Sequence, residues 1–270
     1  MNVESYVNAL AALARNIDAL RAQTPLVQCL TNQVVMNFTA NVLYAVGASP
    51  AMCDNPEEAA GFATNVASGV LVNDGTPSSE QMEGMRLATE AAVAAGKPWV
   101  LDPVAAGGLG WRTAQVKKMM DANPATILRG NASEILGFLG RASGRGVEAT
   151  DSTTDAVDAA RELARHYGCV VAVSGAVDMI TDGDEVIQLA NGSPLLTQVT
   201  GVGCALGAVM AAYASLTNPL DAAIAATSHV NIAAENAAAV AKGPGSFAVE
   251  LLDALAALTG AQAAERVKLA

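Results

Sequence analysis

The sequence predicts an α/β protein with a central, mostly parallel β-sheet that helices cover on both faces. Helical and extended runs alternate along most of the chain, polar residues follow the extended runs, and one glycine-rich segment leads into a long helical stretch. Such alternation is typical of parallel sheets whose strands are buried on both sides. With 270 residues and 52% hydrophobic content, the chain is expected to form one large domain over 1–270.

Helical and extended segments alternate regularly through the first half of the chain. Apolar positions at helical spacing predict a first helix over 3–22, which Thr24-Pro25 closes. Glycines such as Gly47 and Gly96 mark the ends of later helices. The expected strands are 26–30, 48–52, 69–72, 99–101 and 126–128, and the later helices are a stretch ending at 46, then 56–66, 78–95 and 113–120.

The second half adds a β-rich region and then a long helical one. Thr150 and Ser152 are N-cap signals for a helix over 151–167, and Gly183-Asp184 indicates a hairpin. The other expected elements are a helix from 131, extended runs at 169–173, 179–181 and 185–189, a short β-like run at 195–199, and an Ala-rich helical region over 205–258 that is interrupted at 218–219 and 243–245.

Composition and charge exclude several classes of partner. The net charge is −11 with only 15 basic residues and no Lys/Arg run, which argues against binding to nucleic acid or to an anionic membrane. Glu4, Arg15 and Asp18 stand where an export signal would have an apolar core, and polar residues interrupt every Ala-rich stretch. We therefore expect a soluble, cytoplasmic protein.

The cysteines and histidines lack the spacing of a metal site. Cys29, Cys53, Cys169 and Cys204 form no C-x-x-C pair, and the two histidines lie far apart. A zinc site is therefore not expected. In a reducing cytosol each thiol is expected to stay free.

The segment Thr200–Gly207 carries the clearest chemical signal. Gly201, Val202 and Gly203 stand before a helical run, so their backbone N–H groups and the helix dipole form a cradle for a phosphate. Cys204 lies at the same place, and a helix N-terminus lowers the pKa of a thiol, so Cys204 is a candidate base or nucleophile. The alternative is an ordinary buried cysteine after a common glycine turn.

The same glycines also permit a dinucleotide-binding interpretation. Gly201-x-Gly203-x-x-x-Gly207 is a loose Rossmann pattern, and Asp221 lies near the offset of an acidic ribose ligand. In a Rossmann fold that acid ends a second strand. Asp221 instead follows Asn218-Pro219 at the start of a helical stretch, so the oxidoreductase alternative has little support.

Polar residues follow most of the predicted strands. Parallel sheets gather their ligands at the carboxyl ends of the strands, so we expect these residues at one edge of the sheet. Each alone is more typical of a helix cap than of a ligand. The set is Thr31-Asn32, Met52-Cys53-Asp54, Asn73-Asp74, Asp102-Pro103, Arg129-Gly130-Asn131 and Ser174-Gly175.

Asn131 and Glu134 suggest a metal–nucleotide site. Glu134 lies one turn inside the helix that Asn131 caps, where its carboxylate can hold a metal-bound water; the alternative is a simple capping box. Mg²⁺ needs only one or two protein carboxylates besides phosphate oxygens, so Glu134 and Asp102 suffice. Arg129 is then a candidate contact for a nucleotide phosphate.

These segments together resemble a known family. CLTNQVVMNFTANVLYAVGASPAM, LDPV, ILRGNASEI, TGVGC and GPGSFAVELLDAL occur in this order, and the combination resembles the hydroxyethylthiazole kinases, which are ribokinase-like enzymes of thiamine salvage. The resemblance implies phosphorylation of the hydroxyl of 4-methyl-5-(2-hydroxyethyl)thiazole with ATP and Mg²⁺. It also implies a homotrimer with thiazole pockets at the subunit interfaces.

The resemblance assigns roles residue by residue. Met52 and Gly201 match positions that line the thiazole pocket, and Asn32, in the matching TNQ block, is also expected on the substrate side. Arg129 and Ser174 match ATP contacts. The remaining matches are Cys204, where many ribokinase-like enzymes have a base aspartate, Asn131 and Glu134, which match the N-x-x-E metal-and-phosphate motif, and Asp102 in LDPV.

The sequence also permits other functions. Gln28, Ser174 and the loop 105–111 depart from the family pattern. The chain is alternatively another ribokinase-like small-molecule kinase or an ATP-dependent repair hydro-lyase, although these usually keep the aspartate that Cys204 replaces. A non-catalytic thiazole or nucleotide sensor is the third alternative.

Overall fold

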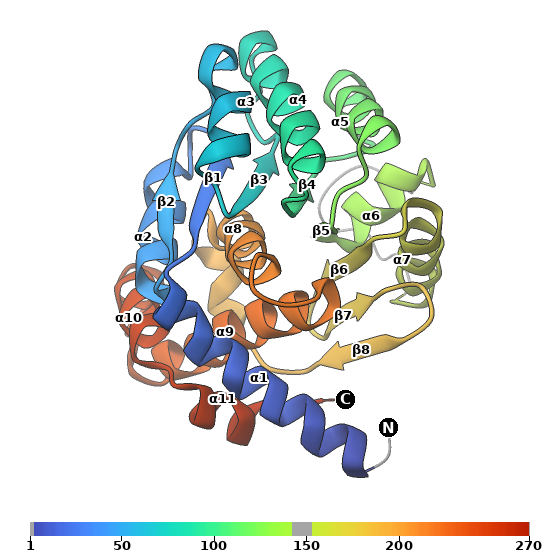
Figure 1. The fold of residues 1–270 in the computed structure, drawn as a ribbon. Coiled ribbons are helices and arrows are strands. Elements are labelled where there is room, and N and C mark those ends of the chain that lie inside the picture. The colour runs from blue at the N-terminus through green and yellow to red at the C-terminus, as the bar shows by residue number, and fades with distance from the viewer. Residues whose placement is uncertain (1–2, 142–152, 270) are drawn as a thin grey trace.

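All eight strands that the structure describes belong to one sheet. The computed structural model describes residues 3–141 and 153–269 of the chain (Figure 1). Strand order is β2-β1-β3-β4-β5-β6-β7-β8; β1 to β6 pair in parallel, whereas β7 and β8 are antiparallel. The strands are β1 Leu26–Leu30, β2 Ser49–Ala51, β3 Gly69–Asn73, β4 Trp99–Asp102, β5 Ile127–Asn131, β6 Val170–Ser174, β7 Asp178–Thr181 and β8 Val186–Leu189.

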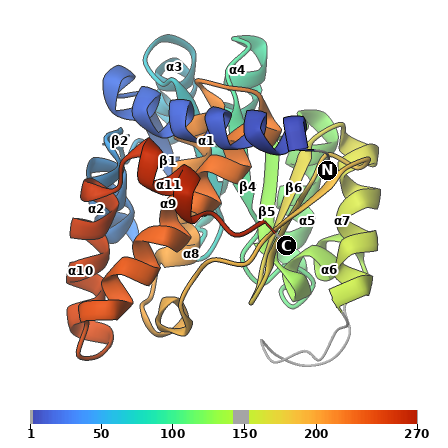
Figure 2. The same cartoon turned by 90° about the horizontal axis from the view of Figure 1, so that it is seen from below.

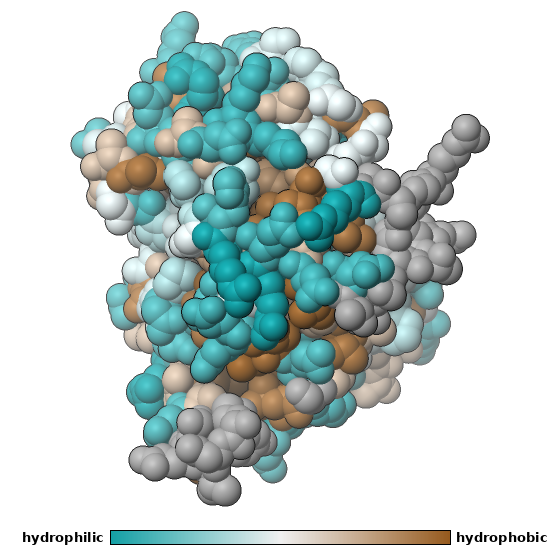
Figure 3. Space-filling model, turned by 90° about the vertical axis from the view of Figure 1, so that its right-hand side faces the viewer, coloured by the Kyte–Doolittle hydropathy of each residue, from teal (hydrophilic) through white to brown (hydrophobic). Residues whose placement is uncertain are grey.

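Helices cover both faces of this sheet, as the sequence predicts (Figure 2). One layer contains α1 Val3–Gln23, α2 Met36–Val46, α8 Val202–Ala214, α9 Pro219–Val240, α10 Pro244–Ala257 and α11 Gly260–Arg266. The other contains α3 Pro56–Asn65, α4 Ser79–Ala94, α5 Gly110–Ala122, α6 Ala132–Leu139 and α7 Thr153–Tyr167. The outer surface over α5 to α7 is mostly polar, with an apolar band between the polar side chains (Figure 3).

Two hydrophobic cores fill the space between the sheet and the two helical layers. Successive strand residues enter opposite cores, because side chains alternate across a strand. Val100, for example, packs on the α8 side, whereas Trp99 and Leu101 pack on the α4 side. Helix α8 lies close to the sheet, since a Cβ at Gly69 would come within 2.5 Å of the Ala211 carbonyl oxygen. The small residues of α8 permit this close approach.

Local signals explain where many helices begin. Asn55, Ser78, Asn131 and Asn218 each cap a helix by accepting a hydrogen bond from a backbone N–H of its first turn. The hairpin at Gly183-Asp184 is confirmed, with Thr181 opposite Val186. Within the described residues no single helix is both long and apolar enough to cross a membrane; α10 and α11 reach that length together, but they meet at a 111° bend.

Several predicted boundaries are wrong. The expected β-like run at 195–199 is a 3-10 helix, η1 Pro194–Gln198, because Ser193 caps it and Pro194 starts it. Strand β5 continues through Asn131, beyond its expected end at 128. Helix α8 begins at Val202 rather than at 205, so the glycine segment forms the first turn of α8 and not a loop before the helix. The expected N-cap signals at Thr150 and Ser152 lie outside the described residues.

Candidate active site

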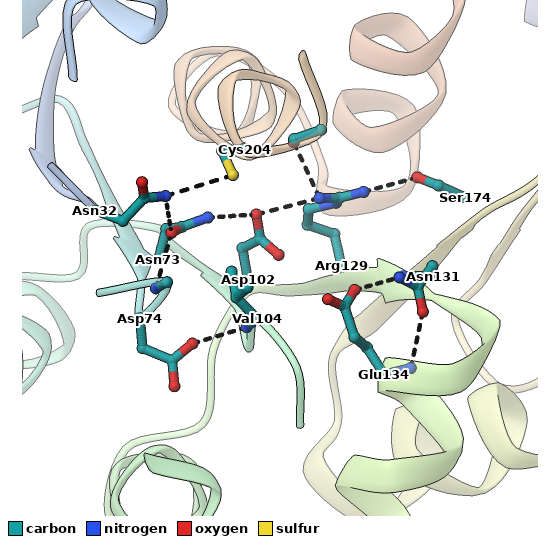
Figure 4. Close-up of polar contacts among 12 residues, drawn as sticks. Asn32, Asn73, Asp74, Asp102, Val104, Arg129, Asn131, Glu134, Ser174 and Cys204 are labelled. Carbon is teal, nitrogen blue, oxygen red and sulfur yellow. Dashed lines mark hydrogen bonds and ion pairs between the residues drawn. The ribbon is translucent and has the colours of Figure 1, made fainter. Parts of the chain in front are cut away.

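Three polar side chains from adjacent strands point toward α8 at the carboxyl edge of the sheet (Figure 4). Asn73 ends β3, Asp102 ends β4, and Arg129 lies in β5; Asn73 and Asp102 are direct partners in the strand register. The strand residues two positions earlier pack in the core on the α8 side: Leu71, Val100 and Ile127. Since side chains two residues apart share a face, the sheet aims all three polar groups at α8.

Asp102 and Arg129 form a buried ion pair. Arg129 Nη1 lies 3.1 Å from Asp102 Oδ2, and the two residues are 6% and 1% exposed. Asn73 Nδ2 donates to the same carboxylate oxygen at 2.7 Å. Burial raises the pKa of Asp102 to about 6, against the opposing effect of Arg129, so the carboxylate is ionised at neutral pH.

Arg129 also connects the strands to α8. Its Nη1 donates to the Gly203 carbonyl oxygen at 2.9 Å, and its Nη2 donates to Ser174 Oγ at 2.8 Å. Its Nε is buried without a partner among the described residues. The expected ATP contacts Arg129 and Ser174 are therefore adjacent, and Arg129 fixes the first turn of α8 over β5 and β6.

Asn32 and Asn73 link this network to Cys204. Asn32 Nδ2 donates to Asn73 Oδ1 at 2.8 Å and lies 3.5 Å from Cys204 Sγ. The thiol is half-buried and free. The structure thus brings together Asn32, Asp102, Arg129 and Cys204, which the sequence places far apart.

The pKa of Cys204 differs in direction from the sequence-based expectation. Burial of the thiol and the nearby Asp102 carboxylate raise it, and together they outweigh Arg129 and the hydrogen bonds from Asn73 and Asn32. The expectation that the helix N-terminus lowers this pKa is wrong, because desolvation disfavours the thiolate more than the helix end favours it.

The first turn of α8 leaves backbone donors available. Gly201 is its N-cap in the left-handed conformation, at φ 97°, and no side chain caps this end. The N–H groups of a first turn have no acceptor inside their own helix. A Cβ at Gly201 would approach Val35 and Phe38 to about 3 Å, so this glycine also permits close contact with the segment that leads into α2.

Asn131 and Glu134 form a capping box at the start of α6. Glu134 N donates to Asn131 Oδ1, and Glu134 Oε2 accepts from Asn131 N, both at 2.9 Å. Glu134 Oε1 accepts from Ala105 N at 3.1 Å. Both carboxylate oxygens are thus held by backbone donors beside Asp102, whose pKa Glu134 helps to raise.

Met52 lies on another part of the same edge. It follows β2, which β1 and β3 separate from β4. Met52 and Phe38 are partly buried members of the hydrophobic core to which Val202 also belongs. The residues expected on the substrate side therefore lie toward α2, whereas the expected nucleotide contacts lie toward β6.

Asp74 belongs to the strand-end set that the sequence predicts at this edge, but the sequence assigns it no role of its own. Its Oδ1 accepts from Val104 N at 2.7 Å, and its Oδ2 is buried without a partner among the described residues. Burial raises the pKa of Asp74 to about 7, against the opposing effects of the Val104 N–H and Arg112. In the sequence, an aspartate at a strand end that accepts a hydrogen bond from a distant loop looks the same as one that caps a helix.

Asp221 lies far from this site in the sequence and serves a local role. It accepts from Asn218 Nδ2 at 2.8 Å at the start of α9, and its N–H donates to Asn218 Oδ1 at 2.9 Å. The preceding helix is α8. The dinucleotide-binding alternative required a strand before this acid, so the structure removes its basis.

Comparisons with known proteins match nearly the whole chain. The hydroxyethylthiazole kinase family matches residues 17–261. A hydroxyethylthiazole kinase of Clavibacter sepedonicus is 58% identical over 252 residues, which are 93% of this chain and 91% of that relative. A relative of the same name from Corynebacterium efficiens is 57% identical over 242 residues, which cover 87% of this chain and 89% of its own.

Solved structures agree with the fold. The structure of a hydroxyethylthiazole kinase protein from Pyrococcus horikoshii OT3 aligns with a TM-score of 0.88 and 37% identity, covering 96% of this chain and 98% of that one. The pyridoxal kinase of Staphylococcus aureus in complex with pyridoxal aligns with a TM-score of 0.59 and 18% identity, over 78% of this chain and 87% of its own, which is a likeness of fold alone. The fold is thus ribokinase-like, as expected.

Proposed function

The chain belongs to the hydroxyethylthiazole kinase family, and from that premise we propose that it transfers the γ-phosphoryl group of ATP, with Mg²⁺, to the hydroxyl of 4-methyl-5-(2-hydroxyethyl)thiazole. The product is the thiazole phosphate of thiamine salvage. The placement of Asp102 and Arg129 beneath the uncapped first turn of α8 supports this function most directly. Phosphoryl transfer depends mainly on alignment and on charge stabilisation, and this arrangement supplies both.

The acidic residues fit a Mg²⁺ ion that also binds phosphate oxygens. Asp102 receives both of its side-chain donors on Oδ2, and no donor among the described residues reaches Oδ1. Glu134 is occupied by backbone N–H groups, so it suits a water in the metal's coordination shell. No cluster of three His, Cys, Asp or Glu side chains within the described part of the chain suits a metal alone. When bound, Mg²⁺ neutralises phosphate charge.

The first turn of α8 stabilises the transferring group in this proposal. The N–H groups of Gly201, Val202, Gly203 and Cys204 hydrogen-bond the equatorial oxygens, each well-placed donor contributing roughly 3–4 kcal/mol, as in oxyanion sites. Arg129 holds the Gly203 carbonyl and thereby fixes the direction of these donors. With Ser174 and Asn131, Arg129 also lies on the nucleotide side.

Cys204 accepts the proton of the substrate alcohol. The alcohol oxygen forms its bond to the γ-phosphorus as the bond to the ADP oxygen breaks, and the alcohol proton passes to Cys204 Sγ. Only the thiolate can accept it, and the raised pKa of Cys204 keeps that form scarce at neutral pH. A loose transition state tolerates this, because little deprotonation is needed before the phosphoryl group moves.

The substrate-binding residues are Met52, Gly201 and Asn32. Asn32 contacts Cys204, and Gly201 lies against Val35 and Phe38, so the thiazole lies between α2 and the first turn of α8. The active form is a cytoplasmic homotrimer of single-domain chains, residues 1–270, with the thiazole pocket at the subunit interface. The single eight-stranded sheet is consistent with one domain.

Product analysis tests this function. Purified protein is incubated with ATP, Mg²⁺ and the thiazole alcohol, and the phosphate ester is measured by mass spectrometry. We expect ester formation that requires all three components, and a loss of at least about a hundredfold in Asp102→Asn. A parallel reaction with pyridoxal in place of the thiazole checks selectivity.

The alternatives give different results in the same assay. Thiazole binding without any ester from folded protein would indicate a sensor. Turnover of pyridoxal or of a pyrimidine alcohol, but not of the thiazole, would indicate another ribokinase-like kinase. Dehydration of a hydrated nicotinamide cofactor would indicate the repair hydro-lyase.

A further inference from the structure

The loop that joins Asp102 to α5, residues 103–109, is held in one unusual conformation. Ala105 has φ 57°, in the left-handed region that residues with a Cβ rarely adopt. The loop lies directly on α6, because a Cβ at Gly137 would come within 2.1 Å of the Ala106 carbonyl oxygen. Gly107 N also donates to the buried Thr113 Oγ1 at 3.0 Å. Strain of this kind persists only where the surroundings fix the backbone.

Two successive backbone donors of this loop contact two different carboxylates. Val104 N donates to Asp74 Oδ1 at 2.7 Å, and Ala105 N donates to Glu134 Oε1 at 3.1 Å. Asp74 follows β3 and Glu134 lies in α6, so the loop connects the two elements on either side of Asp102 (Figure 4). The second of these donors belongs to the left-handed residue Ala105 itself.

Asp74 has no sufficient explanation in stability. It is 1% exposed, its Oδ2 is buried without a partner among the described residues, and the charges of Asp102 and Arg112 act on its carboxyl group. Arg112 Nη1 donates to the Gly75 carbonyl at 2.9 Å rather than to Asp74. A buried carboxyl group with an unpaired oxygen costs free energy, so a neutral or apolar residue at this position would make the fold more stable. The presence of Asp74 here therefore indicates a task other than stabilising the fold.

We propose that Asp74 is a positioning residue for phosphoryl transfer, which acts through Val104 to hold the Ala105 N–H on Glu134 and so fixes Glu134 relative to Asp102. This inference rests on the function proposed above. In this role Asp74 acts through the loop and needs no contact with substrate or nucleotide. Its acceptor oxygen keeps the loop on β3, and the loop in turn restrains one of the two carboxylates expected to serve Mg²⁺.

Two substitutions at one position test this role. Asp74→Ala removes the side-chain acceptor of the Val104 N–H and leaves it only the Asp102 backbone carbonyl at 3.0 Å, whereas Asp74→Asn retains a side-chain carbonyl oxygen for it. We expect Asp74→Ala to lower kcat by about tenfold to a hundredfold and to raise the Mg²⁺ concentration for half-maximal rate, since small displacements of catalytic groups have effects of this size. The KM for the thiazole stays within about threefold, because that pocket lies toward α2. Asp74→Asn should retain most of the wild-type kcat.

Asn191→Ala is the matched control for lost stability. Asn191 is also buried, and its Oδ1 accepts a backbone hydrogen bond from Lys268 N at 2.7 Å, but it follows β8, away from this site. The Asn191→Ala variant should have a lower melting temperature and an unchanged Mg²⁺ concentration for half-maximal rate. An equal fall of kcat in Asp74→Ala and Asn191→Ala, or no rescue by Asp74→Asn, would overturn the positioning role.

Hydrogen exchange separates this inference from the function itself. In Asp74→Ala, without any ligand, the amides of peptides over 103–109 should exchange faster than in wild type, and those of Asp74→Asn should not. Unchanged exchange would refute the mechanical link even if the enzyme phosphorylates the thiazole. Faster exchange in a protein that does not phosphorylate the thiazole would retain the link and reject the proposed substrate.

Discussion

Cys204 carries a proton at neutral pH, because burial and the Asp102 carboxylate both raise the pKa of its thiol. A base in this state differs from an aspartate, which is ionised before the substrate arrives. The thiolate is scarce, but it is a stronger base when it forms. Catalysis that uses Cys204 therefore has a pH dependence that an aspartate would not give.

The first prediction concerns the pH–rate profile. For the wild type we expect kcat to rise continuously from pH 7 to above pH 9, since only the thiolate accepts the alcohol proton and its pKa is raised. Cys204→Ala should lower kcat by roughly a hundredfold, change the thiazole KM little, and flatten this rise. Steady-state kinetics at several pH values measure both effects. An unchanged kcat in the variant would show that Cys204 is not the base.

The raised pKa of Asp74 makes the free energy of unfolding depend on pH. Its pKa is about 7 in the folded protein and near 4 in an unfolded chain, so the folded state binds more protons between these values. Its contribution to stability is full below about pH 4 and is lost as the pH rises through about 7, by about 1.4 kcal/mol per pKa unit. Asp102 and Arg112, whose charges act on this pKa, are unchanged in the Asp74→Asn variant that serves as the comparison.

Denaturant unfolding of wild type and Asp74→Asn from pH 4 to pH 8 measures this effect. The free energy of unfolding of the wild type relative to the variant should fall by several kcal/mol across that window, because the variant cannot ionise. A constant difference would mean that Asp74 ionises with an ordinary pKa in the folded state.

The sequence predicts the order of strands and helices because the signals for each element are local. Alternating periodicity, capping residues and glycine ends each depend on a few neighbouring residues, and most of the predicted elements are present. The predicted β-like run at 195–199 is wrong, although Ser193 and Pro194 are a readable signal for a helical turn there. The β-like composition of this run does not decide its conformation, because the Ser193 cap and the fixed φ of Pro194 favour a helical turn.

The candidate site is predictable only in part. Strand-end positions indicate that Asp102 and Asn32 lie at one edge, because parallel strands share their carboxyl ends. The pairing of Arg129 with the Gly203 carbonyl depends on side-chain conformations across three elements, and the contact of Ala105 with Glu134 depends on a left-handed residue that nothing local requires. Such contacts are set by tertiary packing, to which local sequence signals do not extend.

The third prediction compares two glycines that end or begin helices. Gly201 has φ 97° and Gly140 has φ 86°, so an alanine at either position is strained by about 1 kcal/mol. A Cβ at Gly201 would also press on Val35 and Phe38, whereas a Cβ at Gly140 would meet nothing within 4 Å. Both variants should lose stability, and only Gly201→Ala should lose activity, by tenfold or more, as it displaces the first turn of α8.

Thermal unfolding and kcat measured on the same samples check this comparison. Gly140→Ala serves as the control for backbone strain without contact at the site. Equal activity losses in the two variants would show that strain, rather than the position of α8, limits the rate.

Three exposed apolar side chains lie on or beside α2 and α10 in this chain of net charge −11. Val34 precedes α2 and is 69% exposed, Tyr44 on α2 is 66% exposed, and Val249 on α10 is 61% exposed. Helices α2 and α10 pack side by side (Figure 1). Exposed apolar side chains gathered on neighbouring helices are typical of a protein interface. The substrate-side residues Gly201 and Met52 also lie toward α2.

The last prediction joins the proposed homotrimer to substrate binding through this surface. Light scattering should give a mass near three times the 27.3 kDa of one chain. Tyr44→Glu should dissociate the trimer, because a charge is costly inside an interface, and should raise the thiazole KM at least tenfold while the ATP KM changes little. Trp111→Glu on α5 is the control, since Trp111 is 51% exposed in the opposite helical layer. A monomeric wild type with full activity would contradict both the trimer and an interfacial pocket, whereas a trimeric Tyr44→Glu with a normal thiazole KM would place the interface elsewhere.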